Sequence, residues 1–166
     1  MTEKTYILST IVENKPGVLF RTANMFRRRG FNIESISVGP IEQKDRSRMT
    51  ITVRGDESTI EQIVKQMSKL IDVIKIQVLE DDEKDSVIRE LALIKIMISD
   101  SKALSELTNY STIFRNRIVD VSPESMIVEM TGTPEKINGF LQLVSGYGIK
   151  EIARTGITAL HRGTKK

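Results

Sequence analysis

The sequence of 166 residues predicts an α+β protein built from two ferredoxin-like domains, each with the order strand, helix, strand, strand, helix, strand (βαββαβ). Runs rich in apolar and β-branched residues alternate with segments of helical apolar spacing, and this alternation occurs on both sides of a short acidic stretch. The chain also has 39% hydrophobic and 28% charged residues, a composition typical of globular domains that bury a core.

The first domain, residues 1–79, opens with an apolar strand over residues 5–13. The strand stops at the turn Asn14-Lys15-Pro16-Gly17, and helical spacing begins at Val18. Gly30 is expected to end this helix, because glycine suits the position after a helix and the three preceding arginines favour its negative end.

The remainder of the first domain contains a second helix between strands. This helix is expected to start at Ser58, because Glu61 three residues later completes a capping box. Its core face is predicted to run from Ile60 to Ile71. The expected strands are FNIESISVG (31–39), SRMTITVRG (47–55) and VIKIQVL (73–79).

An acidic linker over residues 80–86 is expected to separate the domains, and the second domain covers residues 87–166. The second domain repeats the order of elements but not the motifs of the first. Thr133-Pro134-Glu135 opens its second helix, because proline is favoured at the first helical position. The other expected elements are strands at 89–99, 117–121, 125–130 and near 149–153, and a helix carrying Leu104, Leu107 and Phe114.

The composition argues against catalysis by this chain. Cysteine is absent, and the one histidine, His161, is expected to be a solvated residue near the C-terminus. The carboxylates Asp120, Glu129 and Glu151 lie on separate segments, without a nucleophile motif or a phosphate-binding loop. We therefore expect no catalytic and no metal-binding residues.

Membrane and targeting features are also absent from the sequence. No apolar run approaches the roughly 20 residues needed to span a bilayer. The first residues lack a basic segment followed by a long apolar one. The expectation is a cytoplasmic protein that does not bind membranes.

An RNA-binding module is an alternative, because RNA-recognition motifs share this βαββαβ order and the net charge is +3. Such modules stack bases on aromatic residues of their central strands, which here offer only Tyr6. The 25 basic and 22 acidic residues are spread along the chain. Nucleic-acid binding is therefore not expected.

The most informative local feature is the turn between the first strand and the first helix. The first N–H groups of a helix have no intrahelical partners and lie at the positive end of its dipole, so they favour a carboxylate. Gly17 permits close approach to the backbone, and the Asn14 amide can both donate and accept hydrogen bonds. These properties fit an amino-acid ligand, although residues 14–17 could instead form only a favourable turn.

A second polar residue, Asn32, interrupts the start of an otherwise apolar strand. Together with Asn14-Lys15-Pro16-Gly17-Val18-Leu19, the segment Gly30-Phe31-Asn32-Ile33-Glu34-Ser35 resembles the ACT domain, a small-molecule sensor of many amino-acid biosynthetic enzymes. Over nearly the whole chain, the sequence resembles the small subunits of acetohydroxyacid synthase, also called acetolactate synthase. The segments that carry this resemblance are ILSTIVENKPGVLFRTANMFRRRGFNIESISVGP, SRMTITVRGD, RELALIKI, IFRNRIVDV, VEMTGTPEKI and EIARTGI.

The resemblance implies a regulatory subunit with no cofactor of its own. Its partner would be a large catalytic subunit that carries thiamine diphosphate, magnesium and FAD. That enzyme makes acetolactate or acetohydroxybutyrate, at the first shared step toward valine, leucine and isoleucine. The regulatory subunit would activate the enzyme and confer feedback inhibition, and a stand-alone amino-acid sensor of the ACT type is the alternative.

In the family, the effector, usually valine, lies between two ACT domains paired edge to edge in a homodimer. The sequence leaves open which branched-chain amino acid binds, because one methyl group changes binding by only about 1–3 kcal/mol. It also leaves open whether activation or inhibition dominates. Carried over to this sequence, the effector-binding residues are Asn14, Gly17, Val18 and Leu19 from the first loop of one copy, and Asn32 and Ile33 from the second strand of the other.

Overall fold

The computed structural model describes residues 4–79 and 85–163, which divide into two compact units. Unit 1 contains the described residues up to Ile88 and those from Ile157 onward, and unit 2 is Arg89–Gly156. Each unit has an antiparallel sheet and the order of elements predicted from the sequence. The α+β class with two βαββαβ domains is therefore confirmed.

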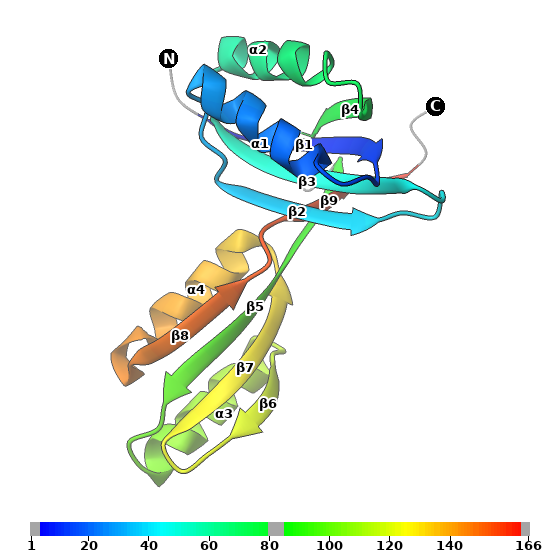
Figure 1. Ribbon diagram of the computed structural model, residues 1–166. Helices are drawn as coiled ribbons and strands as arrows, with labels where there is room; N and C mark the ends of the chain where they lie inside the picture. The colour runs from blue at the N-terminus through cyan, green and yellow to red at the C-terminus, as the bar shows by residue number, and fades with distance from the viewer. Residues whose placement is uncertain (1–3, 80–84, 164–166) are drawn as a thin grey trace. The chain divides into compact units, whose positions relative to one another are not determined.

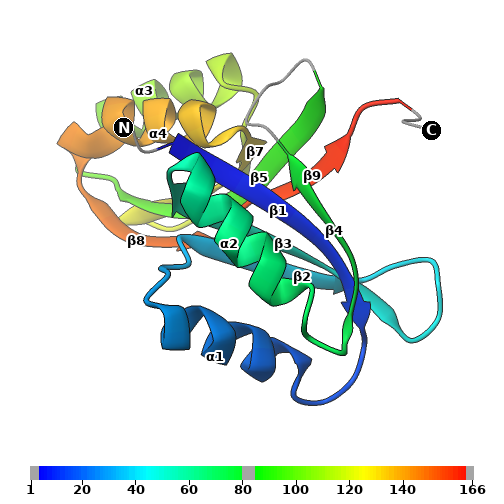
Figure 2. The same ribbon diagram turned by 90° about the horizontal axis from the view of Figure 1, so that it is seen from above.

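Unit 1 is built on a four-stranded sheet. Its elements in chain order are β1 (Lys4–Glu13), α1 (Val18–Arg29), β2 (Ser35–Pro40), β3 (Arg46–Gly55), α2 (Glu57–Met67) and β4 (Val73–Leu79). The strand order is β2-β3-β1-β4, with every neighbouring pair antiparallel. Figures 1 and 2 show α1 and α2 together on one face of the sheet. β2 lies at an edge of this sheet and pairs within it with β3 alone.

Local chemistry explains the limits of α1. Gly17 before the helix and Gly30 after it both adopt the left-handed conformation, with φ of +87° and +70°. Side-chain-bearing residues rarely adopt this conformation, so glycine is favoured at both ends. The prediction that the helix begins at Val18 and ends before Gly30 is confirmed. The apolar face of α1 joins a core made of Leu8, Val12, Val18, Phe26, Met49, Ile51, Val53, Ile60, Ile63 and Met67.

Unit 2 repeats this architecture. Its elements are β5 (Ser86–Met97), whose first residues belong to unit 1, then α3 (Ser101–Ile113), β6 (Arg117–Val121), β7 (Ser125–Gly132), α4 (Pro134–Val144), the short 3-10 helix η1 (Ser145–Tyr147) and β8 (Ile149–Arg154). The strand order β6-β7-β5-β8 gives each strand the place of its counterpart in unit 1. Thr133 caps α4 and Pro134 opens it, as predicted. Within residues 4–79 and 85–163, no helix is long and apolar enough to cross a membrane.

A short strand near the C-terminus, β9 (Thr158–His161), was not predicted. It belongs to unit 1 and pairs with β5. Unit 2 is therefore shorter than the predicted second domain of residues 87–166. Of the predicted linker, residues 80–84 lie outside the described residues. The buried side chains around β9 form a second small core of Ile7, Leu79, Ile88, Ile157 and Ala159.

His161 is half-buried in β9, and its buried Nδ1 atom has no hydrogen-bond partner in the part of the chain that the structure describes. The expectation of a solvated residue near the C-terminus is therefore wrong. The reason is that His161 packs as part of β9, and a strand of four residues is too short to be predicted from one sequence.

Two predictions about α2 are also wrong. The helix begins at Glu57, because the Asp56 carboxylate accepts a hydrogen bond from the Thr59 N–H at 2.8 Å and so occupies the N-cap position expected for Ser58. The helix ends at Met67, four residues before Ile71. Ile71 is 92% exposed and therefore does not belong to the core face.

Candidate functional site

The loop between β1 and α1, residues 14–17, is held by backbone hydrogen bonds from two other loops. The Glu13 N–H donates to the Asp72 carbonyl at 2.9 Å, just before β4. The Asn14 N–H donates to the Asp45 carbonyl at 2.8 Å, in the connection between β2 and β3. These bonds fix the entry of the chain into α1, although Asn14 itself remains exposed.

The N-terminus of α1 differs from that of the other α-helices. Asp56, Asp100 and Thr133 cap α2, α3 and α4 through side-chain oxygens. Gly17 occupies the N-cap position of α1 and has no side chain to do so. The positive end of the α1 dipole is therefore open to an outside acceptor.

The first turn of α1 contains N–H groups that have no acceptor in the described parts of the chain. The Val18 N–H donates weakly to the Lys15 carbonyl at 3.4 Å, and the Arg21 N–H donates to the Gly17 carbonyl at 2.9 Å. Leu19 and Phe20 lie between these two residues, and their N–H groups have no acceptor among the described residues. Backbone donors in this arrangement can receive a carboxylate or another small anion.

A bidentate ion pair that was not predicted stabilises this junction. Arg21 Nε and Nη2 donate to the two carboxylate oxygens of Asp72 at 2.6 and 2.9 Å. The Asp72 side chain is 8% exposed and that of Arg21 is 44% exposed. The hydrogen bonds from Arg21 hold the pKa of Asp72 below its ordinary value and raise the pKa of Arg21. Both groups are therefore charged at neutral pH.

Arg21 also lies close to the glycine of the loop. A Cβ atom built on Gly17 would stand 2.9 Å from Arg21 Nη1. A side chain at position 17 would therefore displace the guanidinium as well as strain the left-handed backbone. The signal for this arrangement in the sequence was Asp72, a charged residue inside the apolar run Leu70-Ile71-Asp72-Val73-Ile74.

The predicted residues of the first loop differ in what they can offer a ligand. Val18 is 5% exposed and packs in the first core, so its side chain is not available. Leu19 is 49% exposed and Phe20, which was not predicted, is 72% exposed. Leu19 and Phe20 therefore place apolar surface beside the open N–H groups.

The two predicted residues of the second set lie at the other end of α1. Asn32 and Ile33 precede β2, which begins at Ser35 and not at Phe31 as predicted. The Asn32 amide donates to the Glu34 carboxylate at 3.1 Å, and Ile33 packs half-buried against the first core. The 12 residues of α1 span about 18 Å. One chain therefore does not bring the two predicted sets together.

The carboxylates considered for catalysis lie on three different strands of unit 2. Asp120 is on β6, Glu129 on β7 and Glu151 on β8. Glu129 stands opposite Arg117, and Glu151 opposite Lys95, in the sheet register. Among the residues described here, no group of three or more histidine, aspartate or glutamate side chains is placed to hold a metal ion.

Comparison with sequence families gives two matches that divide the chain. A model described as the ACT domain of small subunits of acetohydroxyacid synthase matches residues 8–75. A second model, described as the small subunit of acetolactate synthase, matches residues 89–163. The two matches fall on the two βαββαβ arrangements.

Individual relatives match over almost their whole length. The chain is 52% identical to a probable acetolactate synthase small subunit of Methanothermobacter thermautotrophicus, covering 99% of this chain and 97% of the relative. It is 50% identical to the acetolactate synthase small subunit of Mycolicibacterium smegmatis, covering 97% and 93%. The crystal structure of the Thermotoga maritima acetolactate synthase small subunit is 44% identical, with a TM-score of 0.89 and coverage of 98% and 99%.

Proposed function

Because the chain belongs to the family of acetolactate synthase small subunits, we propose that it regulates a separate catalytic large subunit and does no chemistry itself. Family membership and the ACT domain support a regulatory role and imply that large-subunit partner. In this proposal, thiamine diphosphate, magnesium and FAD belong to the large subunit. The complex acts in the cytoplasm, in branched-chain amino-acid synthesis.

The proposed effector is a branched-chain amino acid, with valine as the first candidate. The observation that carries this proposal is the open N-terminus of α1, with unpaired N–H groups at Leu19 and Phe20. A ligand carboxylate there would gain charge-assisted hydrogen bonds and a favourable dipole interaction. The exposed side chains of Leu19 and Phe20 are suited to contact a small apolar side chain.

The ligand's ammonium group would be held by side-chain amides. Asn14 is exposed in the same loop and can accept a hydrogen bond through its carbonyl oxygen. Asn32 would come from a second copy of the chain. This assignment is supported by the position of Asn32 beyond the far end of α1, out of reach of a ligand at Gly17 of its own chain.

The second copy would pair through β2, one of the two edge strands of the sheet in unit 1. A two-fold axis makes such a contact self-complementary, because each copy offers the same surface. Antiparallel pairing of two β2 strands would bring the start of one β2 toward the end of the other. In this homodimer, Asn32 and Ile33 of one copy would lie near the α1 N-terminus of its partner, forming two equivalent sites.

A ligand bound between two copies would favour the dimer geometry that binds it. By linkage, the state of the catalytic subunit would alter effector affinity by the same factor. A coupling of about 1–3 kcal/mol is typical of allosteric proteins, which corresponds to roughly fivefold to 150-fold. This range is sufficient for feedback inhibition.

Reconstitution with a purified catalytic large subunit tests this function. The chain should raise acetolactate synthesis, and valine should then reduce the rate, whereas aspartate and phenylalanine should not. Unchanged synthesis in a mixture whose complex is demonstrated by sedimentation would contradict the regulatory proposal. Binding of valine by the chain without any complex would instead favour the stand-alone sensor.

A further inference from the structure

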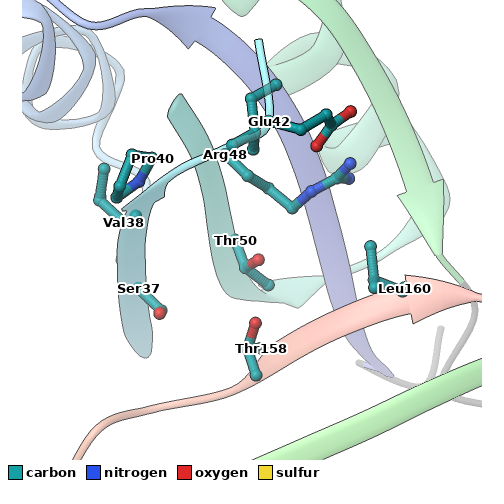
Figure 3. A pocket seen from close by; sticks show the side chains of 10 residues that line it. Ser37, Val38, Pro40, Glu42, Arg48, Thr50, Thr158 and Leu160 are labelled. Carbon is teal, nitrogen blue, oxygen red and sulfur yellow. The ribbon is translucent and has the colours of Figure 1, made fainter. Parts of the chain in front are cut away.

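The face of the first sheet that carries no helix presents a row of small polar side chains. Ser37 of β2 stands opposite Thr50 of β3, and Thr50 stands opposite Ser9 of β1. The strand β9, also part of unit 1, packs on this face through its own buried residues. Between β2, β3 and β9 lies a hollow of about 430 Å³. Figure 3 shows Thr158 and Leu160 of β9 pointing toward Thr50 and Arg48.

Arg48 is the principal charged group of this hollow. It is half-buried, and its Nη1 donates to the Ser9 hydroxyl at 2.8 Å. Arg48 forms no ion pair within the described residues, unlike Arg21 and Arg154, which each meet a carboxylate. A half-buried guanidinium with unused donors favours a carboxylate, which it can bind through two parallel hydrogen bonds.

The rim of the hollow adds a negative charge and an apolar surface. Glu42 lies on the rim and is exposed, beyond ion-pair distance from Arg48. Leu160 is 54% exposed although it lies beside the buried core around β9. An arginine next to exposed apolar surface is typical of protein interfaces, where arginine is enriched.

The lining favours a protein partner over a metabolite. Metabolite pockets are mainly apolar and enclose most of the ligand, whereas this hollow has hydroxyl groups at Ser37, Thr50 and Thr158, and Thr158 is exposed. A protruding side chain from another protein needs no enclosure. Its carboxylate would meet Arg48, and neighbouring apolar groups would cover Leu160.

We propose that this hollow is a docking site for an acidic side chain on the catalytic large subunit. The proposal rests on the proposed function, which supplies the partner. It also places the contact with the large subunit on the sheet face opposite the helices α1 and α2 (Figure 1), whereas the proposed effector site lies at the N-terminus of α1. The strand β2 borders the hollow and also carries the proposed contact with a second copy.

Binding of full-length variants to the purified large subunit tests the docking site. Arg48→Met should weaken binding at least about tenfold, because the partner carboxylate loses its cation. Glu42→Gln should strengthen binding by about threefold, because it removes a like charge from the rim. Arg54→Gln, an equal loss of charge on an exposed position of the same strand, should change affinity by less than about twofold.

The controls separate this site from the proposed function. Arg48→Met should keep valine binding, which shows that unit 1 is folded. If the unmodified chain does not bind the large subunit, the regulatory function and the docking site both fail. If the unmodified chain binds and Arg48→Met binds as well as Arg54→Gln, only the docking site is overturned. A changed molar mass of Arg48→Met alone in solution would assign the hollow to a second copy, which also overturns the proposal.

Discussion

The junction between the first strand and the first helix differs between the two units: the helix N-terminus is capped by a side chain in unit 2 and uncapped in unit 1. In unit 2, the Asp100 carboxylate accepts a hydrogen bond from the Ala103 N–H at 2.8 Å and closes the N-terminus of α3. In unit 1, Gly17 takes the place of Asp100, and the Phe20 N–H, at the position of Ala103, has no acceptor within residues 4–79 and 85–163. Unit 2 therefore supplies its own carboxylate at the helix N-terminus, while unit 1 leaves that position free for a carboxylate from a ligand.

The bidentate ion pairs of the two units also differ in position: the pair in unit 1 lies at the junction and the pair in unit 2 does not. In unit 1, Arg21 joins the first turn of α1 to Asp72 at the start of β4. In unit 2, Arg154 at the end of β8 joins Glu90 on β5 at 2.7 Å, and the junction at Asp100 has no such pair among the described residues. In unit 1 the ion pair therefore lies next to the open helix end, where a ligand site benefits from fixed geometry.

Converting the open junction into the closed one should have the largest effect. Gly17→Asp places a carboxylate where the ligand carboxylate is proposed to bind. Like-charge repulsion costs several kcal/mol, so valine affinity should fall more than about 100-fold, measured by isothermal titration.

A control for the backbone strain of Gly17→Asp is available in unit 2. Gly148 has φ of +91° and ψ of 109°, which residues with side chains adopt even more rarely than the left-handed conformation of Gly17, so Gly148→Asp imposes at least as much backbone strain far along the chain from the loop. Valine binding should survive in Gly148→Asp. Equal loss in both variants would show that strain, and not occupation of the helix end, explains the result.

Removing the ion pair beside the open junction should have an intermediate effect. Arg21→Gln leaves the backbone donors in place but releases Asp72 and the loop that it steadies. Valine affinity should fall about tenfold, in the range of indirect effects on a binding site. An affinity unchanged by Arg21→Gln would mean that the backbone bonds of Glu13 and Asn14 suffice to hold the loop.

Opening the closed junction should affect stability and not binding. Asp100→Ala removes the cap of α3, which should lower the free energy of unfolding of unit 2 by about 1 kcal/mol. Urea unfolding followed by circular dichroism measures this change. Asp100→Ala should bind valine with the same affinity as the unmodified chain. A lower affinity would show that the junction in unit 2 also contributes to valine binding.

The smallest expected effect concerns pH. Because the pKa of Asp72 is depressed by Arg21, its contribution to stability is fully present above the ordinary carboxyl value of about 3.9 and is lost as pH falls through the lower folded value. The stability difference between the unmodified chain and Asp72→Asn should stay constant from pH 7 to about pH 5 and shrink below about pH 4. Urea unfolding of both proteins at each pH measures this stability difference. A stability difference that disappears near pH 6 would exclude the Arg21–Asp72 ion pair as its cause.

Features set by neighbouring residues were predictable from the sequence. The limits of α1 follow from Gly17 and Gly30, and the start of α4 follows from Thr133 and Pro134, because these residues act within one turn of their position. The strand at 73–79 matches β4 because its apolar run is bounded on both sides.

Features set by distant residues were not predictable. β9 has four residues and is stabilised by packing against Ile7 and Leu79, far away in the sequence. The partner of Arg21 is 51 residues away. The burial of Val18 and the late start of β2 also depend on packing in three dimensions, which one sequence does not specify.

The proposed effector site combines Gly17 of one copy with Asn32 of another. Gly17→Asp and Asn32→Ala should each bind little or no valine. When the two variants are refolded together, half of the dimers should be mixed, and each mixed dimer should contain one intact site. Valine titration should then recover about one quarter of the sites of the unmodified chain. If native mass spectrometry shows mixed dimers but no sites are recovered, Gly17 and Asn32 do not serve one site across two copies, which contradicts the proposed effector site.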